Sequence, residues 1–90
     1  MSTPAPSHTA KRRHSLLASL YFEPVSTARV RTLVQQLDVV HNVVASSDLV
    51  RSDLMWLQEM ELVRLKDDLA TLTERGRDVA TGLAQFPAAL

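Results

Sequence analysis

The chain has 90 residues, of which 46% are hydrophobic and 22% charged, and ten basic residues balance ten acidic ones. This composition is typical of one small folded domain and excludes disorder throughout the chain. The sequence contains no cysteine, which excludes disulfides and thiolate metal sites. Since no apolar run approaches the roughly 20 residues of a membrane span, and 15–20 is too short and polar for a signal-peptide core, we expect a cytoplasmic protein.

The first third of the chain predicts a tail and two helices. Residues 1–9 are rich in proline, serine and threonine, which is typical of a flexible tail. A helix is predicted from Ala10 to the residues before Pro24, because a proline disfavours helical backbone at the residue that precedes it. Its apolar face has three- and four-residue spacing: Leu16, Leu17, Leu20 and Tyr21. Ser26 is a suitable N-cap for a second helix over 27–37, which has its own apolar stripe: Val30, Leu33, Val34 and Leu37.

The segment 39–45 is rich in β-branched residues and follows this second helix. We expect it to form a short strand that pairs with a later hairpin, which gives a three-stranded sheet. An alternative continues the second helix through Val40 and leaves only 42–45 extended. Of the two, we favour a break between Asp38 and Asn42.

A third helix is predicted over 48–60, capped by Ser46 or Ser47. Its apolar stripe follows the i, i+4, i+7 pattern: Val50, Leu54 and Leu57. Trp56 is the only tryptophan and has two interpretations. The first is helix packing, because a large ring buries much apolar area, and the second is a platform on which nucleic-acid bases stack.

A β-hairpin and a last helix follow. Two short segments of strand type, 62–65 and 69–72, are joined by an aspartate-rich loop. Thr73 caps the last helix and Glu74 lies favourably in its first turn. We expect that helix to continue to about Phe86 through three recurring apolar residues: Val79, Leu83 and Phe86. The folded domain is therefore expected over residues 10–86, with 87–90 as a C-terminal tail.

The sequence gives little support for catalysis. The histidines lack the close spacing of zinc ligands: His8, His14 and His41. The adjacent Asp67 and Asp68 are typical of a solvated turn, and two isolated glycines cannot form a phosphate-binding loop. We therefore expect a protein that is not an enzyme, uses no metal or cofactor and has no evident small-molecule substrate.

A helix followed directly by a hairpin is the arrangement of a winged helix, whose third helix enters the major groove of DNA. The sequence thus predicts an α+β winged helix-turn-helix fold with three helices, a short β-ribbon wing and a C-terminal helix. Residues of the third helix off its apolar stripe are candidates for groove contacts: Ser47, Arg51, Ser52 and Met55. Basic residues elsewhere are candidates for phosphate contacts: Lys11, Arg12, Arg13, Arg29, Arg31 and Lys66.

The charge distribution favours a second function. Residues 11–31 contain five basic residues and one acidic residue, a local excess of +4, whereas 48–90 contain five basic and eight acidic residues, an excess of −3. The third helix carries three carboxylates and one arginine: Asp48, Asp53, Glu59 and Arg51. Nucleic-acid modules ordinarily show a clear basic face. Binding to double-stranded DNA is therefore the first hypothesis, and docking of the acidic helix on a protein partner or a second copy of the chain is the alternative.

The segment 72–80, LTERGRDVA, resembles the segment that follows the wing in many bacterial and phage winged-helix proteins. The wider run 51–80 resembles small single-domain proteins encoded by Mu-like transposable phages and prophages, with similarity over about residues 12–82. The resemblance implies a winged-helix fold and a phage or prophage setting. It implies DNA binding and transcriptional regulation by analogy, because a fold does not determine a function.

Overall fold

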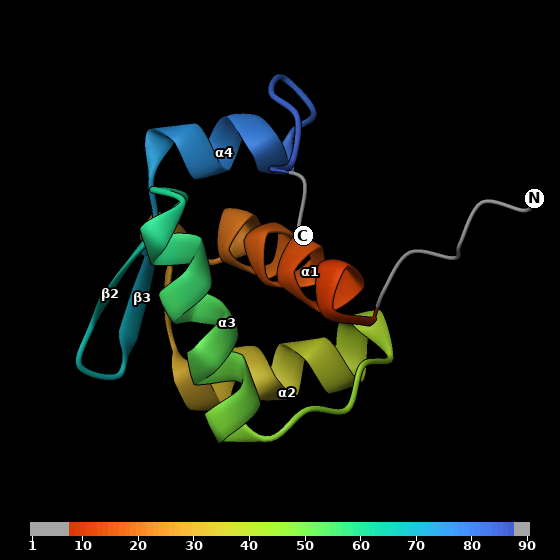
Figure 1. The fold of residues 1–90 in the computed structure, drawn as a ribbon. Coiled ribbons are helices and arrows are strands. Elements are labelled where there is room, and N and C mark those ends of the chain that lie inside the picture. The colour runs from red at the N-terminus through yellow and green to blue at the C-terminus, as the bar shows by residue number, and fades with distance from the viewer. Residues whose placement is uncertain (1–7, 88–90) are drawn as a thin grey trace, which may run out of the picture.

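The computed structural model describes residues 8–87. In this part of the chain four helices pack beside a three-stranded antiparallel sheet of order β1-β3-β2 (Figure 1). The elements are α1 (His8–Phe22), a 3₁₀ turn (Pro24–Ser26), β1 (Thr27–Arg29), α2 (Val30–His41), α3 (Ser47–Glu59), β2 (Val63–Lys66), β3 (Leu69–Leu72) and α4 (Glu74–Ala80). None of the helices within residues 8–87 has both the length and the apolar character needed to cross a membrane. The class is α+β, as the sequence predicts.

Helix α1 lies at the centre of the molecule, between α4 and α2, with α3 crossing beside it (Figure 1). Its leucines are fully buried, as their spacing predicts: Leu16, Leu17 and Leu20. The predicted stripe of α3 is also fully buried: Val50, Leu54 and Leu57. Tyr21 lies at the margin of the core and is 38% exposed. One continuous core therefore forms where the apolar faces of the helices meet.

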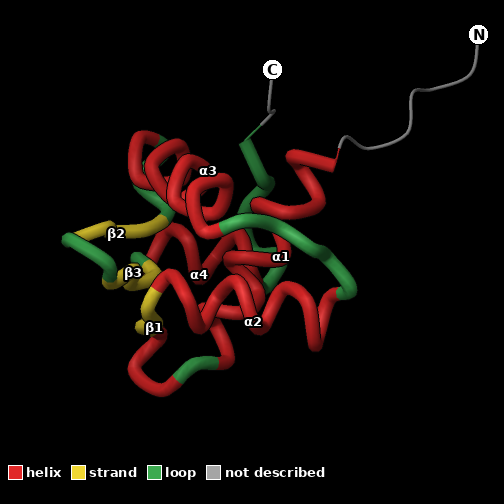
Figure 2. The backbone as a smooth tube through the Cα atoms, turned by 90° about the horizontal axis from the view of Figure 1, so that it is seen from below, coloured by secondary structure: helices red, strands yellow, loops and turns green. Residues whose placement is uncertain are grey.

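The sheet lies at one edge of the molecule, with the helices gathered on its inner side (Figure 2). Strand β3 is central: Thr71 pairs with Thr27 of β1 and with Arg64 of β2. A two-residue turn joins β2 to β3, and its first residue, Asp67, has left-handed backbone (φ 54°). Alternate residues of β3, Ala70 and Leu72, face the core. The predicted hairpin is confirmed, with its first strand shifted by one residue.

The third strand is not the predicted one. The sequence analysis placed it at 39–45 and began the second helix at Thr27, whereas 27–29 form β1 and α2 continues to His41. Thr27 Oγ1 donates a hydrogen bond to Thr71 Oγ1 (3.2 Å), and the backbone N–H of Val30 donates to the Asp68 carbonyl (3.0 Å). Pairing with the free edge of the hairpin therefore overrides the helical pattern of this segment.

The residues predicted as that strand have two other structures. Val39 and Val40 lie on the outer face of α2 and are 74% and 63% exposed. Asn42 ends the helix with left-handed backbone (φ 58°), and its N–H donates to the Leu37 carbonyl. Residues 42–46 form a loop. The alternative that continued the second helix through Val40 is therefore closer to the structure.

Two of the three predicted helix caps are present; the third is not, because Ser26 lies in the 3₁₀ turn and the N-cap position of α2 is Arg29, which makes no side-chain cap. The Ser46 Oγ accepts a hydrogen bond from the Leu49 N–H (3.1 Å), and the Thr73 Oγ1 accepts one from the Gly76 N–H (3.0 Å). Gly76 is required by close approach, because a Cβ there would overlap the carbonyl oxygen of Leu62.

The boundaries at the two ends of the domain differ from those predicted. Helix α4 ends at Ala80 rather than near Phe86, because residues 81–87 leave the helix axis and Gly82 has left-handed backbone (φ 82°). Helix α1 includes His8 and Thr9, which the sequence analysis assigned to the tail. Residues 1–7 and 88–90, the rest of the two predicted tails, lie outside the described residues.

Candidate nucleic-acid interface

Two of the arginines predicted to contact phosphates are held inside the molecule by Asp53, whose side chain is 1% exposed. Arg12 Nε donates a hydrogen bond to Asp53 Oδ2, and Arg12 Nη2 donates to Oδ1 (3.0 Å). Arg13 Nε also donates to Oδ1 (3.0 Å). The hydrogen bond with Asp53 raises the pKa of the Arg12 guanidinium above its ordinary value, although burial acts in the opposite direction. The structure therefore does not place these arginines on a surface open to phosphates.

Trp56 packs in the same α1–α3 interface. The Arg13 guanidinium lies 4.2 Å from the centroid of the Trp56 ring, and the Phe86 ring lies 6.0 Å away in a stacked arrangement. Trp56 is half-buried and serves helix packing, in agreement with the first interpretation of this residue.

The positions of the charged residues in the sequence contained a sign of the buried ion pairs. Asp53 follows Val50 by three residues and precedes Leu57 by four, so it lies on the apolar stripe of α3. Arg12 precedes Leu16 by four residues and lies on the apolar face of α1 in the same way. Opposite charges on two apolar faces that pack together indicate an internal pair, because a lone buried charge is strongly unfavourable.

The N-terminal half of α3 contacts the tip of the hairpin through a different ion pair. Arg51 Nη2 donates to the Asp68 carboxylate (2.6 Å), and Arg51 Nη1 donates to the Asp67 carbonyl (3.3 Å). The side chains of Arg51 and Asp68 are 42% and 45% exposed. The proposed groove residue Arg51 is therefore at the surface and already has an anionic partner.

Two further basic residues flank the same hairpin tip. Arg29 of β1 and Lys66 of β2 both pair with Leu69 of β3, one on each side of it. Both side chains are exposed and line a depression of about 250 Å³ beside the turn. We call the following group the hairpin-tip cluster: Arg29, Arg51, Lys66, Asp67 and Asp68. It brings together three of the sequence-predicted residues with an excess of one positive charge.

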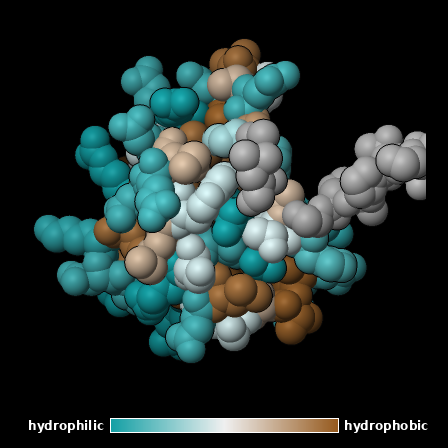
Figure 3. Space-filling view, in the orientation of Figure 1, coloured by the Kyte–Doolittle hydropathy of each residue, from teal (hydrophilic) through white to brown (hydrophobic). Residues whose placement is uncertain are grey.

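The remaining candidates lie in two places. Four of them are exposed on α3 or in the first turn of α2: Ser47, Ser52, Met55 and Arg31. Figure 3 shows hydrophilic side chains on the hairpin side of the molecule. Lys11, in contrast, lines a depression on α1 together with His41 and Phe86, so it does not join the hairpin-tip cluster.

The internal position of Asp53 also changes the charge of the predicted reading helix. Asp48 and Glu59 remain exposed on α3, while Asp53 is paired with two arginines of α1. The outer surface of α3 is therefore less acidic than its composition indicates. This change could not be read from the count of charges, because the count does not say which side chains face solvent.

Among residues 8–87, no group of three or more histidine, cysteine, aspartate or glutamate side chains is arranged to hold a metal ion. Comparisons of the chain with protein-family models, with curated proteins and with solved structures found no match.

Proposed function

We propose that the chain is a non-catalytic winged-helix protein that binds double-stranded DNA, as a regulator or accessory protein of a phage or prophage. The single observation that carries this proposal is the contact of the hairpin tip with the first half of α3, through Arg51 and Asp68 at 2.6 Å. A reading helix and a wing act together only when they share one surface. The order of helices and hairpin along the chain supports the same assignment.

In this proposal the exposed residues of α3 enter the major groove. Arg51 bonds to a guanine edge or to a phosphate, and Ser47 and Ser52 donate to nearby phosphates or bases. Before binding, Arg51 is held by Asp68 in an exposed pair. Because exposed pairs contribute only about 0–1 kcal/mol, exchange of the carboxylate for a DNA group has a small penalty.

The basic residues around the hairpin tip supply the attraction to the backbone. Arg29 and Lys66 flank the tip, and Arg31 is the exposed second residue of α2. Each phosphate contact releases bound counterions, so the affinity should fall steeply with salt concentration. With a formal net charge of zero on the whole chain, we expect binding to be strong only at low ionic strength.

Fluorescence anisotropy with a mixed-sequence duplex at several salt concentrations tests the proposal. We expect Arg51→Ala to weaken binding by about 1–3 kcal/mol, and Lys66→Ala to reduce the salt slope by about one. Arg75→Ala is the matched control. Arg75 is an exposed arginine that pairs with Glu61 (3.4 Å), and Glu61 precedes the start of β2, whereas the hairpin tip follows the end of β2. Absence of binding at the lowest salt concentration, or an equal loss in the control variant, would contradict the proposal.

A protein partner is the second candidate, and exposed apolar side chains on α3 favour it. Leu49 and Met55 are 40% and 54% exposed on the same helix as Asp48. Such side chains are more useful in a protein contact than against phosphates. Multi-angle light scattering of the wild type and of Met55→Lys separates the two candidates. A wild-type dimer that Met55→Lys converts to a monomer favours self-association, whereas a wild-type monomer that binds the duplex favours DNA.

A further inference from the structure

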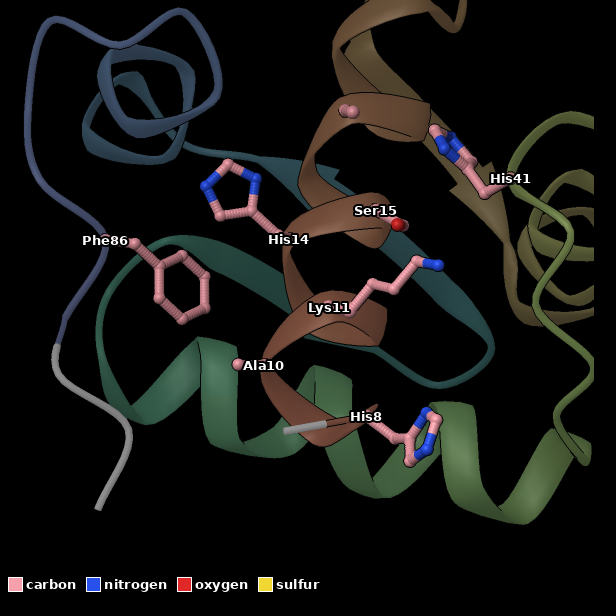
Figure 4. A pocket seen from close by; sticks show the side chains of 8 residues that line it. His8, Ala10, Lys11, His14, Ser15, His41 and Phe86 are labelled. Atoms are coloured by element: carbon pink, nitrogen blue, oxygen red, sulfur yellow. The ribbon is translucent and has the colours of Figure 1, made fainter. Parts of the chain in front are cut away.

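The three histidines of the chain, which are far apart in the sequence, line one depression. His8 and His14 lie on α1, and His41 is the last residue of α2 (Figure 4). Phe86, from the segment after α4, forms the opposite wall. The volume of about 700 Å³ is within the range of small-molecule sites in proteins.

The polar groups of this depression favour an anion. Lys11 contributes an ammonium group, and Ser15 and the histidines contribute further hydrogen-bond donors. In the described part of the chain, no aspartate or glutamate is among the lining residues. A second depression, of about 280 Å³, shares His8 and Lys11 and is also lined without a carboxylate in the described residues.

The opposite wall is apolar and held in place by stacked rings. The rings of Phe86 and His14 are 5.0 Å apart with an interplanar angle of 30°, and those of Phe86 and Trp56 are 6.0 Å apart at 29°. The Arg13 guanidinium covers Trp56 at 4.2 Å. Because Arg13 is in turn bonded to Asp53, the position of Phe86 is coupled to the internal ion pairs. A planar ligand can therefore pack against a wall that is already formed.

We propose that this depression binds a small organic anion in which a carboxylate or phosphate group is attached to a planar apolar ring. Lys11 binds the anionic group, and the ring packs near Phe86 and the alanine side chains of α1. The depression shares no lining residue with the one at the hairpin-tip cluster, so the two proposals can be tested separately.

The charged groups around the depression also favour an anion. The titratable groups on α1 and α2 that face the depression are His8, Lys11, His14 and His41. On the neighbouring helices, Asp38, three residues before His41, is exposed and does not line the depression, and Asp53 is paired with Arg12 and Arg13. The other carboxylates of α3 and α4 are also not among its lining residues: Asp48, Glu59, Glu74 and Asp78. Residues 81–87 add no titratable side chain.

The histidine ring signals in NMR spectra provide a direct test, because every histidine of the chain lines this depression. The full chain is titrated with benzoate and with phenyl phosphate, and benzyl alcohol is the uncharged control. We expect saturable shifts of the histidine signals with a dissociation constant in the millimolar range or below, together with a change in Trp56 fluorescence.

A matched pair of variants locates the anion. Lys11→Gln should weaken binding of both anions about tenfold, which corresponds to loss of one charge-assisted hydrogen bond. Arg75→Gln also removes one positive charge, at an exposed arginine that belongs to neither proposed site, and should leave the affinity unaltered. The tighter of the two anions then identifies the ligand as a carboxylate or a phosphate monoester. Equal binding of benzyl alcohol and benzoate, equal effects of the two variants, or histidine signals that do not respond to either anion would overturn the proposal.

Discussion

Helix α3 makes ion pairs on two of its sides, and the two sides differ in burial and in the number of partners. Towards α1, Asp53 is 1% exposed and is bonded to Arg12 and Arg13. Towards the hairpin, Arg51 and Asp68 form a single pair with side chains 42% and 45% exposed. A buried charge that loses its partner is strongly destabilising, whereas an exposed charge is solvated by water. The comparison indicates that the ion pairs of Asp53 stabilise the fold, whereas the Arg51–Asp68 pair lies on a surface where Arg51 can exchange Asp68 for another partner.

The largest effect on the free energy of unfolding is expected when the carboxylate of Asp53 on α3 is removed. Asp53→Ala leaves the Arg12 and Arg13 guanidinium groups in a buried interface without their carboxylate, which should lower the free energy of unfolding by about 3–5 kcal/mol. Small domains are stable by only about 5–15 kcal/mol, so this variant should be close to unfolding. Urea denaturation followed by circular dichroism measures the change.

A triple variant keeps this prediction open to test even if Asp53→Ala does not fold. Arg12→Met and Arg13→Met combined with Asp53→Leu replace all three charges by apolar groups, and such replacements are often neutral or stabilising. We expect its stability to be much closer to that of the wild type. If Asp53→Ala changed the free energy of unfolding by less than about 1 kcal/mol, the distinction between the two ion pairs would be wrong.

A smaller loss is expected from Arg13→Ala. Arg12 still neutralises Asp53 in this variant, but one hydrogen bond and the contact of Arg13 with the Trp56 ring disappear. The two losses together should lower the free energy of unfolding by about 1–2 kcal/mol. The fluorescence of Trp56 should change, since its ring loses the covering guanidinium. Arg13→Lys retains the charge and should recover part of the stability, and an equally destabilised lysine variant would argue against a charge effect.

The smallest effect on stability is expected for the exposed Arg51–Asp68 pair, whose variants should instead change the affinity for DNA. Arg51→Ala and Asp68→Asn should each change the free energy of unfolding by at most about 1 kcal/mol. Their effects on the affinity for duplex DNA should be opposite, because the first removes the groove arginine and the second releases it from its carboxylate. Anisotropy titrations of both variants at one low salt concentration provide the measurement. If both variants changed the affinity for DNA in the same direction, the assignment of Arg51 as the residue that contacts the groove would be wrong.

Several parts of the candidate site could be predicted, and the reasons are local. The caps formed by Ser46 and Thr73, and the hairpin between them, depend on neighbouring residues in the sequence. The positions of Arg29 and Lys66 beside one turn were not predicted, because they depend on the pairing of β1 with β3. The gathering of the histidines was missed for the same reason, since His41 approaches α1 only after α1 and α2 pack together.

The sequence by itself determined the number and order of the main helices, the apolar stripes of the first three, the caps of the last two and the hairpin. These features depend on interactions within a few residues, which spacing and residue type report directly. The tertiary structure alone decided which segment completes the sheet and which charges face inward. Those outcomes depend on contacts between distant residues: Thr27 and Thr71 are 44 positions apart, and Arg12 and Asp53 are 41 apart. Local patterns cannot report such contacts, because the energy of each pairing depends on how the whole core packs around it.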